Sequence, residues 1–257
     1  MKRFLLIIIS LLYFLNVSSQ IFEKRPSWQQ EFKYRGKIDD TFWNCQKEQF
    51  NNYKEFYTDS INNIFVKNGK LHLRATSNKR GDRLCSSGRV NTLNKQSFLY
   101  GKLEIRAKVP TGKGIFPAIW MLRVDHPRKY PLGEIDIMEY IDCFEGNSFC
   151  STSHIIEKLN DREKKHSYTF TKEAEVLKYH IYGLEWTPEQ LVFTLDHKEF
   201  YRLKKEDVEC WPFDSPYYLI LNVAFGNWGA KCGLDENIFP KEMVIDWIRY
   251  YKLKSSF

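Results

Sequence analysis

Three carboxylate side chains fall within six residues of a segment that is otherwise apolar. Glu134, Asp136 and Glu139 are separated by isoleucine and methionine residues. The alternation of acidic and apolar residues predicts a β-strand with Glu134 and Asp136 on one face. Strict alternation would send Glu139 to the other face, and one residue bulged out near Met138 would return it to the acidic face. A strand that presents Glu, Asp and Glu along a cleft suits glycoside hydrolysis.

The three acids can be given separate roles in that chemistry. We expect Glu134 to be the nucleophile and Glu139 to be the acid/base that protonates the leaving oxygen, while Asp136 hydrogen-bonds the nucleophile. Repulsion between neighbouring carboxylates should raise the pKa of one of them and keep it protonated near neutral pH. Because the sequence does not give the distance between the carboxylates, it does not decide between retention and inversion at the anomeric carbon.

Two other interpretations of the acidic segment stay open. Clustered carboxylates can bind Ca²⁺, but known calcium loops place their oxygens along a glycine-containing turn, not along a strand rich in Ile and Met. A solvated strand face could also carry three acids, although that interpretation would need no bulge. The pattern favours the glycosidase interpretation over both.

A sugar-binding cleft also needs aromatic side chains, and the chain has 7 Trp and 15 Tyr residues. Trp120 lies shortly before the acidic strand, and Trp228 lies between Asn227 and Gly229. A single Trp is more often part of the core than of a binding surface. Trp228 is the better candidate for an exposed ring, because its Asn and Gly neighbours indicate a loop.

The elements that must position these residues are short strands joined by turns containing Gly and Pro. A hairpin is predicted around Gly69, and residues 145–175 are polar and poorly patterned, which predicts long loops around a strand near His154. About a dozen strands with almost no helical periodicity indicate an all-β, two-sheet β-sandwich. Besides the acidic strand, the main strands are expected over residues 64–66, 71–75, 100–109, 118–122, 179–186, 191–196, 199–203, 217–224 and 243–251.

The first 19 residues have the features of a signal peptide. Lys2 and Arg3 precede an apolar run at residues 4–15, and Val17 and Ser19 suit a small-residue cleavage site. The run is too short to span a bilayer comfortably, so we expect a cleaved signal and not a membrane anchor. The mature protein is therefore predicted to be secreted or periplasmic, without membrane association after cleavage.

Removal of residues 1–19 from the 257 leaves 238, which is consistent with a single all-β catalytic domain over residues 20–257. The leader carries two basic residues and no acids, so its removal lowers the net charge from +7 to +5. The remaining basic residues are scattered, and no nucleic-acid partner is expected. The sequence shows no internal repeat and no linker, and we expect a monomer.

The cysteines are even in number, which is compatible with disulfides in an exported chain. Cys143 and Cys150 could close a small loop just after the acidic strand, although six cysteines allow fifteen pairings. No two cysteines have zinc-ligand spacing, and a free buried thiol stays an alternative for each. The six are Cys45, Cys85, Cys143, Cys150, Cys210 and Cys232.

The wider sequence resembles glycoside hydrolase family 16, and most closely its laminarinase-like β-glucanases. The E-x-D-x-x-E signature of the family's active strand, in its bulged form, falls on Glu134, Asp136 and Glu139. The resemblance spans nearly the whole chain after the leader. Its other motifs lie at residues 98–110 (FLYGKLEIRAKVP), 116–122 (FPAIWML), 182–188 (YGLEWTP), 218–222 (YLILN) and 244–249 (VIDWIR).

The resemblance implies a jelly-roll sandwich with a concave substrate-binding cleft, and a retaining mechanism with Glu134 as nucleophile and Glu139 as acid/base. It also implies a set of substrate-binding residues. Other interpretations remain for some of them, since an Asn can serve a turn, an Arg a surface ion pair and a His the structure alone. The implied set is Asn52, Arg89, Trp120, His154 and Trp228.

No cofactor is expected for catalysis, whereas a structural Ca²⁺ on the convex side is common in the family. The resemblance places the side chains of Glu31 and Asp246 and the backbone carbonyl of Gly69 at the matching positions. These oxygens are of the type that Ca²⁺ prefers.

Departures from the family pattern concern the substrate. Phe225 precedes a single Gly226 where the family's glucanases usually have two glycines, and Tyr130 replaces an expected Trp. Around His154, the aromatic and Gly neighbours are replaced by Ile-Ile-Glu at residues 155–157. The walls of the cleft are therefore expected to differ from those of the glucanases, while the catalytic strand is intact.

These features lead us to expect an exported retaining endo-β-glycosidase that acts on a β-linked polysaccharide. A laminarin-like β-1,3(4)-glucan is the first substrate expected. The alternative is an endo-β-galactosidase acting on poly-N-acetyllactosamine, mucin-type O-glycans or galactans. A non-catalytic glycan-binding protein is disfavoured because all three acids are present. A transglycosylase stays open, since a sugar hydroxyl can also intercept a glycosyl-enzyme.

Overall fold

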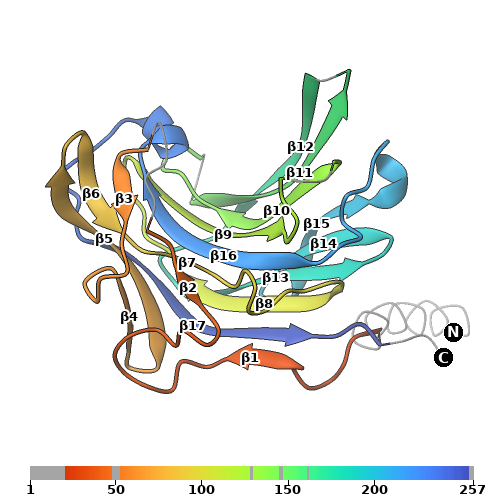
Figure 1. Ribbon diagram of the computed structural model, residues 1–257, viewed down its shortest axis with the longest axis horizontal. Helices are drawn as coiled ribbons and strands as arrows, with labels where there is room; N and C mark the ends of the chain where they lie inside the picture. Colours follow the sequence, from red (N-terminus) through yellow and green to blue (C-terminus); the bar gives the residue numbers. More distant parts are fainter. Residues whose placement is uncertain (1–20, 48–52, 128–129, 145–146, 161, 255–257) are drawn as a thin grey trace, which may run out of the picture.

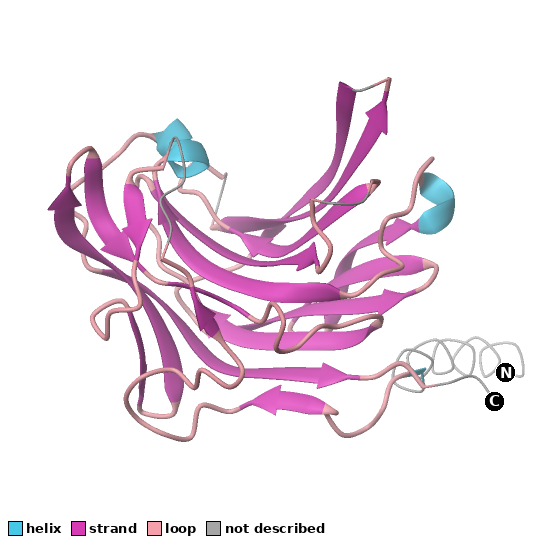
Figure 2. Cartoon of the chain, viewed as in Figure 1, coloured by secondary structure: helices cyan, strands magenta, loops and turns pink. Residues whose placement is uncertain are grey.

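The computed structural model describes residues 21–47, 53–127, 130–144, 147–160 and 162–254. Over these residues the regular secondary structure is almost entirely β-strand, with two short 3₁₀-helices, η1 (Lys205–Asp207) and η2 (Asn227–Cys232) (Figure 2). The strands pair into two curved sheets, one nested inside the other (Figure 1). The predicted all-β, two-sheet sandwich is confirmed. None of the helices found in these ranges has the length and apolarity needed to cross a membrane.

The larger sheet, called the outer sheet below, lies on the outside of the curve in Figure 1. Its strand order is β15-β14-β13-β8-β17-β5-β6-β3, with β1 paired to β17 and β4 paired to β5. The strands are β1 (Trp28–Gln30), β3 (Glu55–Tyr57), β4 (Ile64–Lys67), β5 (Lys70–Arg80), β6 (Arg83–Ser87), β8 (Gly101–Lys108), β13 (His180–Thr187), β14 (Gln190–Leu195), β15 (Lys198–Lys204) and β17 (Lys241–Tyr251).

The smaller sheet, called the cleft sheet below, lies on the inside of the curve and contains the acidic strand. Its strand order is β12-β11-β10-β9-β16-β7-β2, and neighbouring strands are antiparallel. The strands are β2 (Asn44–Cys45), β7 (Arg89–Asn91), β9 (Ile115–Arg123), β10 (Leu132–Glu139), β11 (Ser148–Leu159), β12 (Arg162–Glu173) and β16 (Tyr217–Phe225).

The hydrophobic core fills the space between the two sheets. Ile135 and Ile137 of β10 are buried and belong to the same cluster as Ile105 of β8 and Ile245 of β17. Because successive side chains of a strand point to opposite faces, burial of the isoleucines leaves the acids of β10 on the face away from the core. Because one face of β10 is apolar and buried in the core, its carboxylates point away from the core.

Over residues 145–175, the expected strand near His154 is confirmed, whereas the expectation of long loops around it is wrong. This segment forms β11 and β12, which pair with each other over twelve residues each. Strand β12 is the edge of the cleft sheet, and most of its side chains are exposed. An edge strand that is solvated on its faces needs no apolar alternation, so the sequence carries no periodic signal for it. In Figure 1 the end of the hairpin at which β11 is joined to β12 rises above the rest of the cleft sheet.

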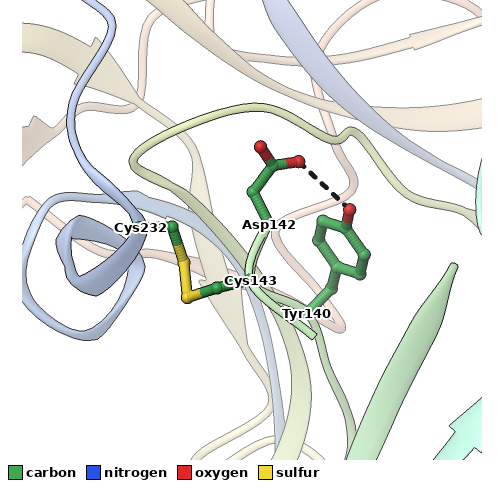
Figure 3. Close-up of a disulfide and its surroundings, with 4 residues drawn as sticks. All are labelled: Tyr140, Asp142, Cys143 and Cys232. Carbon is green, nitrogen blue, oxygen red and sulfur yellow. Dashed lines mark hydrogen bonds between the residues drawn. A yellow bond between two sulfur atoms is a disulfide. The ribbon is translucent and has the colours of Figure 1, made fainter. Parts of the chain in front are cut away.

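The disulfide suggested between Cys143 and Cys150 is also wrong. Cys143 is bonded to Cys232, with 5.3 Å between their Cα atoms (Figure 3). Strand pairing holds Cys150 opposite Glu139, whereas Cys143 lies in the loop beyond β10, beside the end of η2. The four other cysteines have free thiols: Cys45, Cys85, Cys150 and Cys210.

Candidate active site

Strand β10 contains the bulge that the acidic spacing requires. Against β11, the register shifts between Asp136 and Glu139. Against β9, the two-residue step from Asp136 to Met138 is matched by a single residue of the partner strand. The extra residue returns Glu139 to the face of Glu134 and Asp136. All three carboxylates, called the acidic row below, line one cavity, so the predicted common face is confirmed.

His154 of β11 lies opposite Glu134 and contacts the acidic row. Its Nε2 is 3.2 Å from Asp136 Oδ2 and 3.9 Å from Glu134 Oε1, and its Nδ1 is 2.7 Å from Ser167 Oγ. Burial lowers the pKa of His154 to about 4 and outweighs the opposing effect of Glu134. The imidazole is therefore neutral at neutral pH and brings no positive charge to the carboxylates.

The pKa values of Asp136 and Glu139 are raised well above those of ordinary carboxyl groups. Burial is the main cause for both, and neighbouring carboxylates add to it: Glu134 acts on Asp136, while Asp136 and Glu134 act on Glu139. The Sγ of Cys150 lies 3.9 Å from Glu139 Oε2. Glu139 thus keeps its proton at a pH where an exposed glutamic acid has lost it, which is the state that a general acid needs.

The wall beside the acidic row is built by β9, β16, β7 and β3. The indole Nε1 of Trp120 donates a 2.7 Å hydrogen bond to Asn222 Oδ1, and Asn222 Nδ2 lies 3.5 Å from the hydroxyl of Tyr57. The guanidinium of Arg89 lies 5.0 Å from the ring centre of Trp120 and 5.7 Å from that of Tyr57. Hydrogen bonding and cation–π contacts therefore hold these aromatic and polar groups in fixed orientations.

The acidic row and this wall bound a cavity of about 350 Å³. It combines carboxylates, aromatic rings, an amide and a guanidinium, a mixture that suits a ligand with both hydroxyl groups and apolar ring faces, such as a sugar. The lining residues are Tyr53, Tyr57, Arg89, Phe116, Ala118, Trp120, Leu122, His126, Glu134, Asp136, Glu139 and Asn222.

The structure brings most of the residues implied as substrate-binding to this place. Arg89 and Trp120 line the cavity, and His154 contacts two of the acids. The ring of Trp228 lies beside the cavity, edge-on to the lining residue Phe116 with 5.2 Å between ring centres. Asn52 lies outside the described residues. The binding roles of the whole set stay predictions.

Sequence reasoning did not single out Asn222 or Tyr57, which support the wall. Asn222 is a buried polar residue among apolar neighbours of β16. A buried amide needs hydrogen-bond partners, and this was the signal that could have identified it. Tyr57 is one of 15 tyrosines and carries no comparable signal in the sequence.

The positions predicted to hold Ca²⁺ lie on the outer sheet, away from the acidic row. Asp246 accepts a 2.7 Å hydrogen bond from Lys70 Nζ and a second one from Arg106. Gly69 occupies the turn immediately before Lys70. A carboxylate that already binds an ammonium and a guanidinium fits Ca²⁺ poorly.

Glu31 is engaged in the same way, since its carboxylate binds Arg249 at 2.8 and 3.3 Å.

A second group of possible metal ligands lies in the cleft, where the donor atoms of Glu134, Asp136 and His154 lie within 4.8 Å of one another. The raised pKa of Asp136 favours its protonated form, which is a poor metal ligand. We therefore assign no chemistry to a metal ion, and calcium binding stays a prediction.

Comparison with known proteins gives the same picture as the geometry. The family model for glycosyl hydrolases family 16 matches residues 47–249. A β-glucanase of Rhodothermus marinus is 33% identical over 250 residues, which cover 90% of this chain and 87% of the relative. The X-ray structure of the laminarinase from Rhodothermus marinus has a TM-score of 0.79 and 31% identity, covering 91% of this chain and 100% of the other.

A third relative has a different named substrate. The keratan-sulfate endo-1,4-β-galactosidase of Sphingobacterium multivorum is 31% identical over 239 residues, which cover 88% of this chain and 54% of the relative. The nested β-sheets and the acidic row are those of an endo-acting glycoside hydrolase that cleaves O-glycosidic bonds. The chain belongs to glycoside hydrolase family 16 and is similar to its laminarinases.

Proposed function

We propose that the protein is an exported retaining endo-β-glycosidase whose first substrate is a laminarin-like β-1,3(4)-glucan. One observation carries the chemistry. The bulge in β10 puts Glu139, with its raised pKa, on the same face as Glu134. A protonated and an ionisable carboxyl group therefore face one cavity, as a double-displacement mechanism requires.

In the first step, the Glu134 carboxylate attacks the anomeric carbon while Glu139 gives its proton to the leaving oxygen. The glycosidic C–O bond breaks and a glycosyl ester forms on Glu134. In the second step, Glu139 removes a proton from water, and the water oxygen attacks the same carbon. The ester bond to Glu134 then breaks, and both acids return to their starting states.

Asp136 and His154 support this cycle without entering it. The raised pKa of Asp136 favours its protonated form, which can donate a hydrogen bond to the side chain of Glu134. Neutral His154 lies within 3.9 Å of both and orders the polar side chains between β10 and β11. The raised pKa values of Asp136 and Glu139 thus favour their protonated forms, and the third acid, Glu134, acts as the nucleophile.

The matches from Rhodothermus marinus support a glucan substrate, since they are described as a β-glucanase and a laminarinase. The tryptophan and arginine of the cavity wall are compatible with this substrate, because a glucose ring offers an apolar face and a rim of hydroxyl groups. The length of the product oligosaccharides depends on subsites beyond this cavity.

A β-galactoside-containing glycan is the second candidate, and the cleft margin favours testing it. The hydroxyl of Tyr130, which stands where the glucanases have a Trp, donates to Glu163 on the β11–β12 hairpin. Residues 155–157 on the same hairpin also depart from the glucanase pattern. One relative is described as a β-glucanase and another as a keratan-sulfate endo-1,4-β-galactosidase, so chains similar to this one differ in their substrates.

Export, signal cleavage after residue 19, a single catalytic domain over residues 20–257 and a monomeric state belong to the same proposal. The Cys143–Cys232 disulfide supports export, because disulfides persist in oxidising compartments. No nucleic acid and no membrane takes part in the proposed activity.

A product assay on purified protein tests the proposal. Laminarin, mixed-linkage β-glucan, agarose-type galactan, keratan sulfate and mucin O-glycans are incubated separately, and the new reducing ends and oligosaccharides are measured. Release from the two glucans supports the first substrate, and release from galactans, keratan sulfate or mucin alone supports the second. Longer products that appear only with an added acceptor would identify a transglycosylase. Binding without any product would identify a glycan-binding protein and overturn the proposal.

A further inference from the structure

A small aromatic cluster lies beyond the Glu139 end of β10, separate from the main core. Phe116, Ile141 and Ala224 are its buried members, and the partly buried Tyr53, Phe144, Trp228 and Cys232 pack against them. Phe116 and Tyr53 also line the active-site cavity. The cluster is therefore the packing support for one end of the cleft.

The central ring of this cluster is contributed by η2. Trp228 packs edge-on against Phe116 at 5.2 Å and against Phe144 at 5.7 Å between ring centres. Phe116 belongs to β9, whereas Phe144 belongs to the loop after β10. The position of Trp228 thus depends on two segments, one a central strand of the cleft sheet and the other a loop.

A covalent bond ties the same loop to the same 3₁₀-helix. Cys143 is adjacent to Phe144 and four residues after Glu139, and Cys232 is the last residue of η2, which also carries Trp228. The two cysteines are 89 residues apart in the sequence, and Figure 3 shows their bond closing the loop against η2. The bond therefore fixes the distance between the Phe144 loop and the Trp228 helix.

The backbone hydrogen bonds of the two segments run to other partners. Tyr140 N donates to Pro117 O at 3.3 Å, and Gly226 N donates to Gly114 O at 2.9 Å. These bonds hold the start of each segment to the region of β9. Between the two segments themselves, ring packing and the disulfide supply the contacts described above.

We propose that the Cys143–Cys232 disulfide is a positioning element for glycan binding, which holds Phe144 and Trp228 against Phe116 and so fixes the cleft wall at the Glu139 end. Breaking it frees the loop and lets the Trp228 ring leave Phe116. The three acids stay in place, because β10 is held on both sides by strand pairing. Loss of the disulfide therefore weakens polymer binding more than it slows bond cleavage. This inference rests on the proposed function only in taking a glycan as the ligand.

Dithiothreitol is a suitable reductant for the test. Its thiolate attacks one sulfur of the disulfide, the S–S bond breaks, and the mixed disulfide is resolved by the second thiol of the same reagent. The protein is left with two protonated thiols, and the reagent is left as its cyclic disulfide. No further oxidant or reductant is needed.

The kinetic test uses the double variant Cys143→Ser/Cys232→Ser in the full chain, with Cys45→Ser/Cys210→Ser as the matched control that removes two free thiols. With laminarin, the first variant should show KM raised about five- to tenfold, as expected for one loosened aromatic contact, and kcat changed by no more than about twofold. Dithiothreitol should raise KM equally for the wild type and the control and leave the first variant unchanged. An unchanged KM, or a fall in kcat alone, would overturn the proposal.

Hydrogen exchange separates failure of this inference from failure of the proposed function. In the Cys143→Ser/Cys232→Ser variant, amide exchange should become faster over residues 140–144 and 226–232 and remain slow over β9 and β10. If the wild type hydrolyses none of the glycans tested, the proposed function fails, while this exchange pattern still supports the positioning role of the disulfide. Unchanged exchange in both segments contradicts that role, and faster exchange throughout the cleft sheet contradicts it by showing a general loss of stability.

Discussion

The three carboxyl groups on β10 face a cleft in which a neutral histidine and a thiol lie close to them, and in which the cation Lys165 only partly offsets the effect of burial. On β17 of the outer sheet, Glu242 and Asp246 are bound by basic side chains. The same kinds of residue, carried by two strands of one sandwich, are thus placed in opposite electrostatic surroundings.

The pKa values follow these surroundings. Burial alone would raise the pKa of Glu242, but the hydrogen bonds from His72 Nδ1 and Arg74 Nε, both at 2.7 Å, outweigh it and lower the value. Asp246 is lowered in the same way by its two cationic partners. In the cleft no such partner outweighs burial, so the values for Asp136 and Glu139 are raised.

The fold thus uses its acids for stability on the outer sheet and for chemistry in the cleft. Ion pairs on the outer sheet favour the folded chain at neutral pH, since the unfolded acids would bind protons more tightly. The acidic row of the cleft instead gathers repelling groups in a buried place, which is unfavourable for folding and useful for proton transfer.

The largest effect is expected from replacing the proposed nucleophile. Glu134→Gln should lower kcat by roughly 10⁴-fold or more, because the first covalent step is lost. The free energy of unfolding should stay the same or rise, since a partly buried carboxylate is replaced by a neutral amide of similar shape. Kinetic assays and chemical denaturation would check both quantities.

Glu242→Gln on the outer sheet is the matched control for that variant. It should keep kcat within about twofold of the wild type, and it should lose about 1 kcal/mol of unfolding free energy because its two basic partners no longer face a charged carboxylate. The contrast between the sheets fails if Glu242→Gln is as inactive as Glu134→Gln, or if Glu134→Gln keeps near-normal activity.

The next effect concerns the raised pKa of Glu139. Activity should fall as pH rises through this pKa, because the acid must be protonated. The falling limb of the pH–activity profile should therefore lie at a pH well above the ordinary pKa of a glutamic acid. In Glu139→Gln, kcat on glucan should drop about 10²- to 10⁴-fold. With an activated aryl glycoside, which needs little acid assistance, this variant should lack the falling limb. A limb that persists unchanged would show that another group is responsible.

A smaller effect is expected on stability through His154. Its pKa is lowered to about 4 in the folded protein, whereas the unfolded value is about 6.5. Between these values the unfolded chain binds more protons, so the wild type loses stability as pH falls, by up to about 3 kcal/mol across the window. His154→Gln should be spared this loss. Denaturant titrations of both proteins at pH 4, 5, 6 and 7 would measure it, and parallel curves would contradict the burial of a neutral histidine.

Chelation should have the smallest effect. Because Lys70 and Arg106 already bind Asp246, EDTA should shift Tm by less than about 2 °C and leave activity unchanged. A loss of several degrees that Ca²⁺ restores and Mg²⁺ does not would show that the outer sheet binds calcium after all, with its basic side chains displaced.

The fold class and the acidic row could be predicted because they depend on local periodicity. Alternating burial of Ile135 and Ile137 fixes the face of β10, and the odd offset of Glu139 then requires a bulge. Such two-residue periodicity survives in any strand with one buried face. The predicted bulge is among the features that the structure confirms.

Features that depend on contacts between distant segments could not be predicted. Edge strand β12 has no buried face and hence no pattern, and Cys143 finds its partner 89 residues away. Asn222 of β16 accepts a hydrogen bond from Trp120 on the neighbouring strand β9, although its register partner there is Ala118, so the contact depends on strand pairing and on side-chain direction. The sequence predicted a raised pKa for one acid of β10, but it did not show that Asp136 and Glu139 would both be raised or that burial would be the main cause.

In the proposed mechanism Glu134 forms a covalent bond to the sugar with Glu139 as the acid/base, and this intermediate can be trapped. The Glu139→Ala variant is incubated with a laminari-oligosaccharyl fluoride, which needs no acid to leave, and the quenched protein is digested and analysed by mass spectrometry. The mechanism predicts one glycosyl adduct, carried by the peptide that contains Glu134. An adduct on another residue, or turnover with an inverted first product and no adduct, would contradict it.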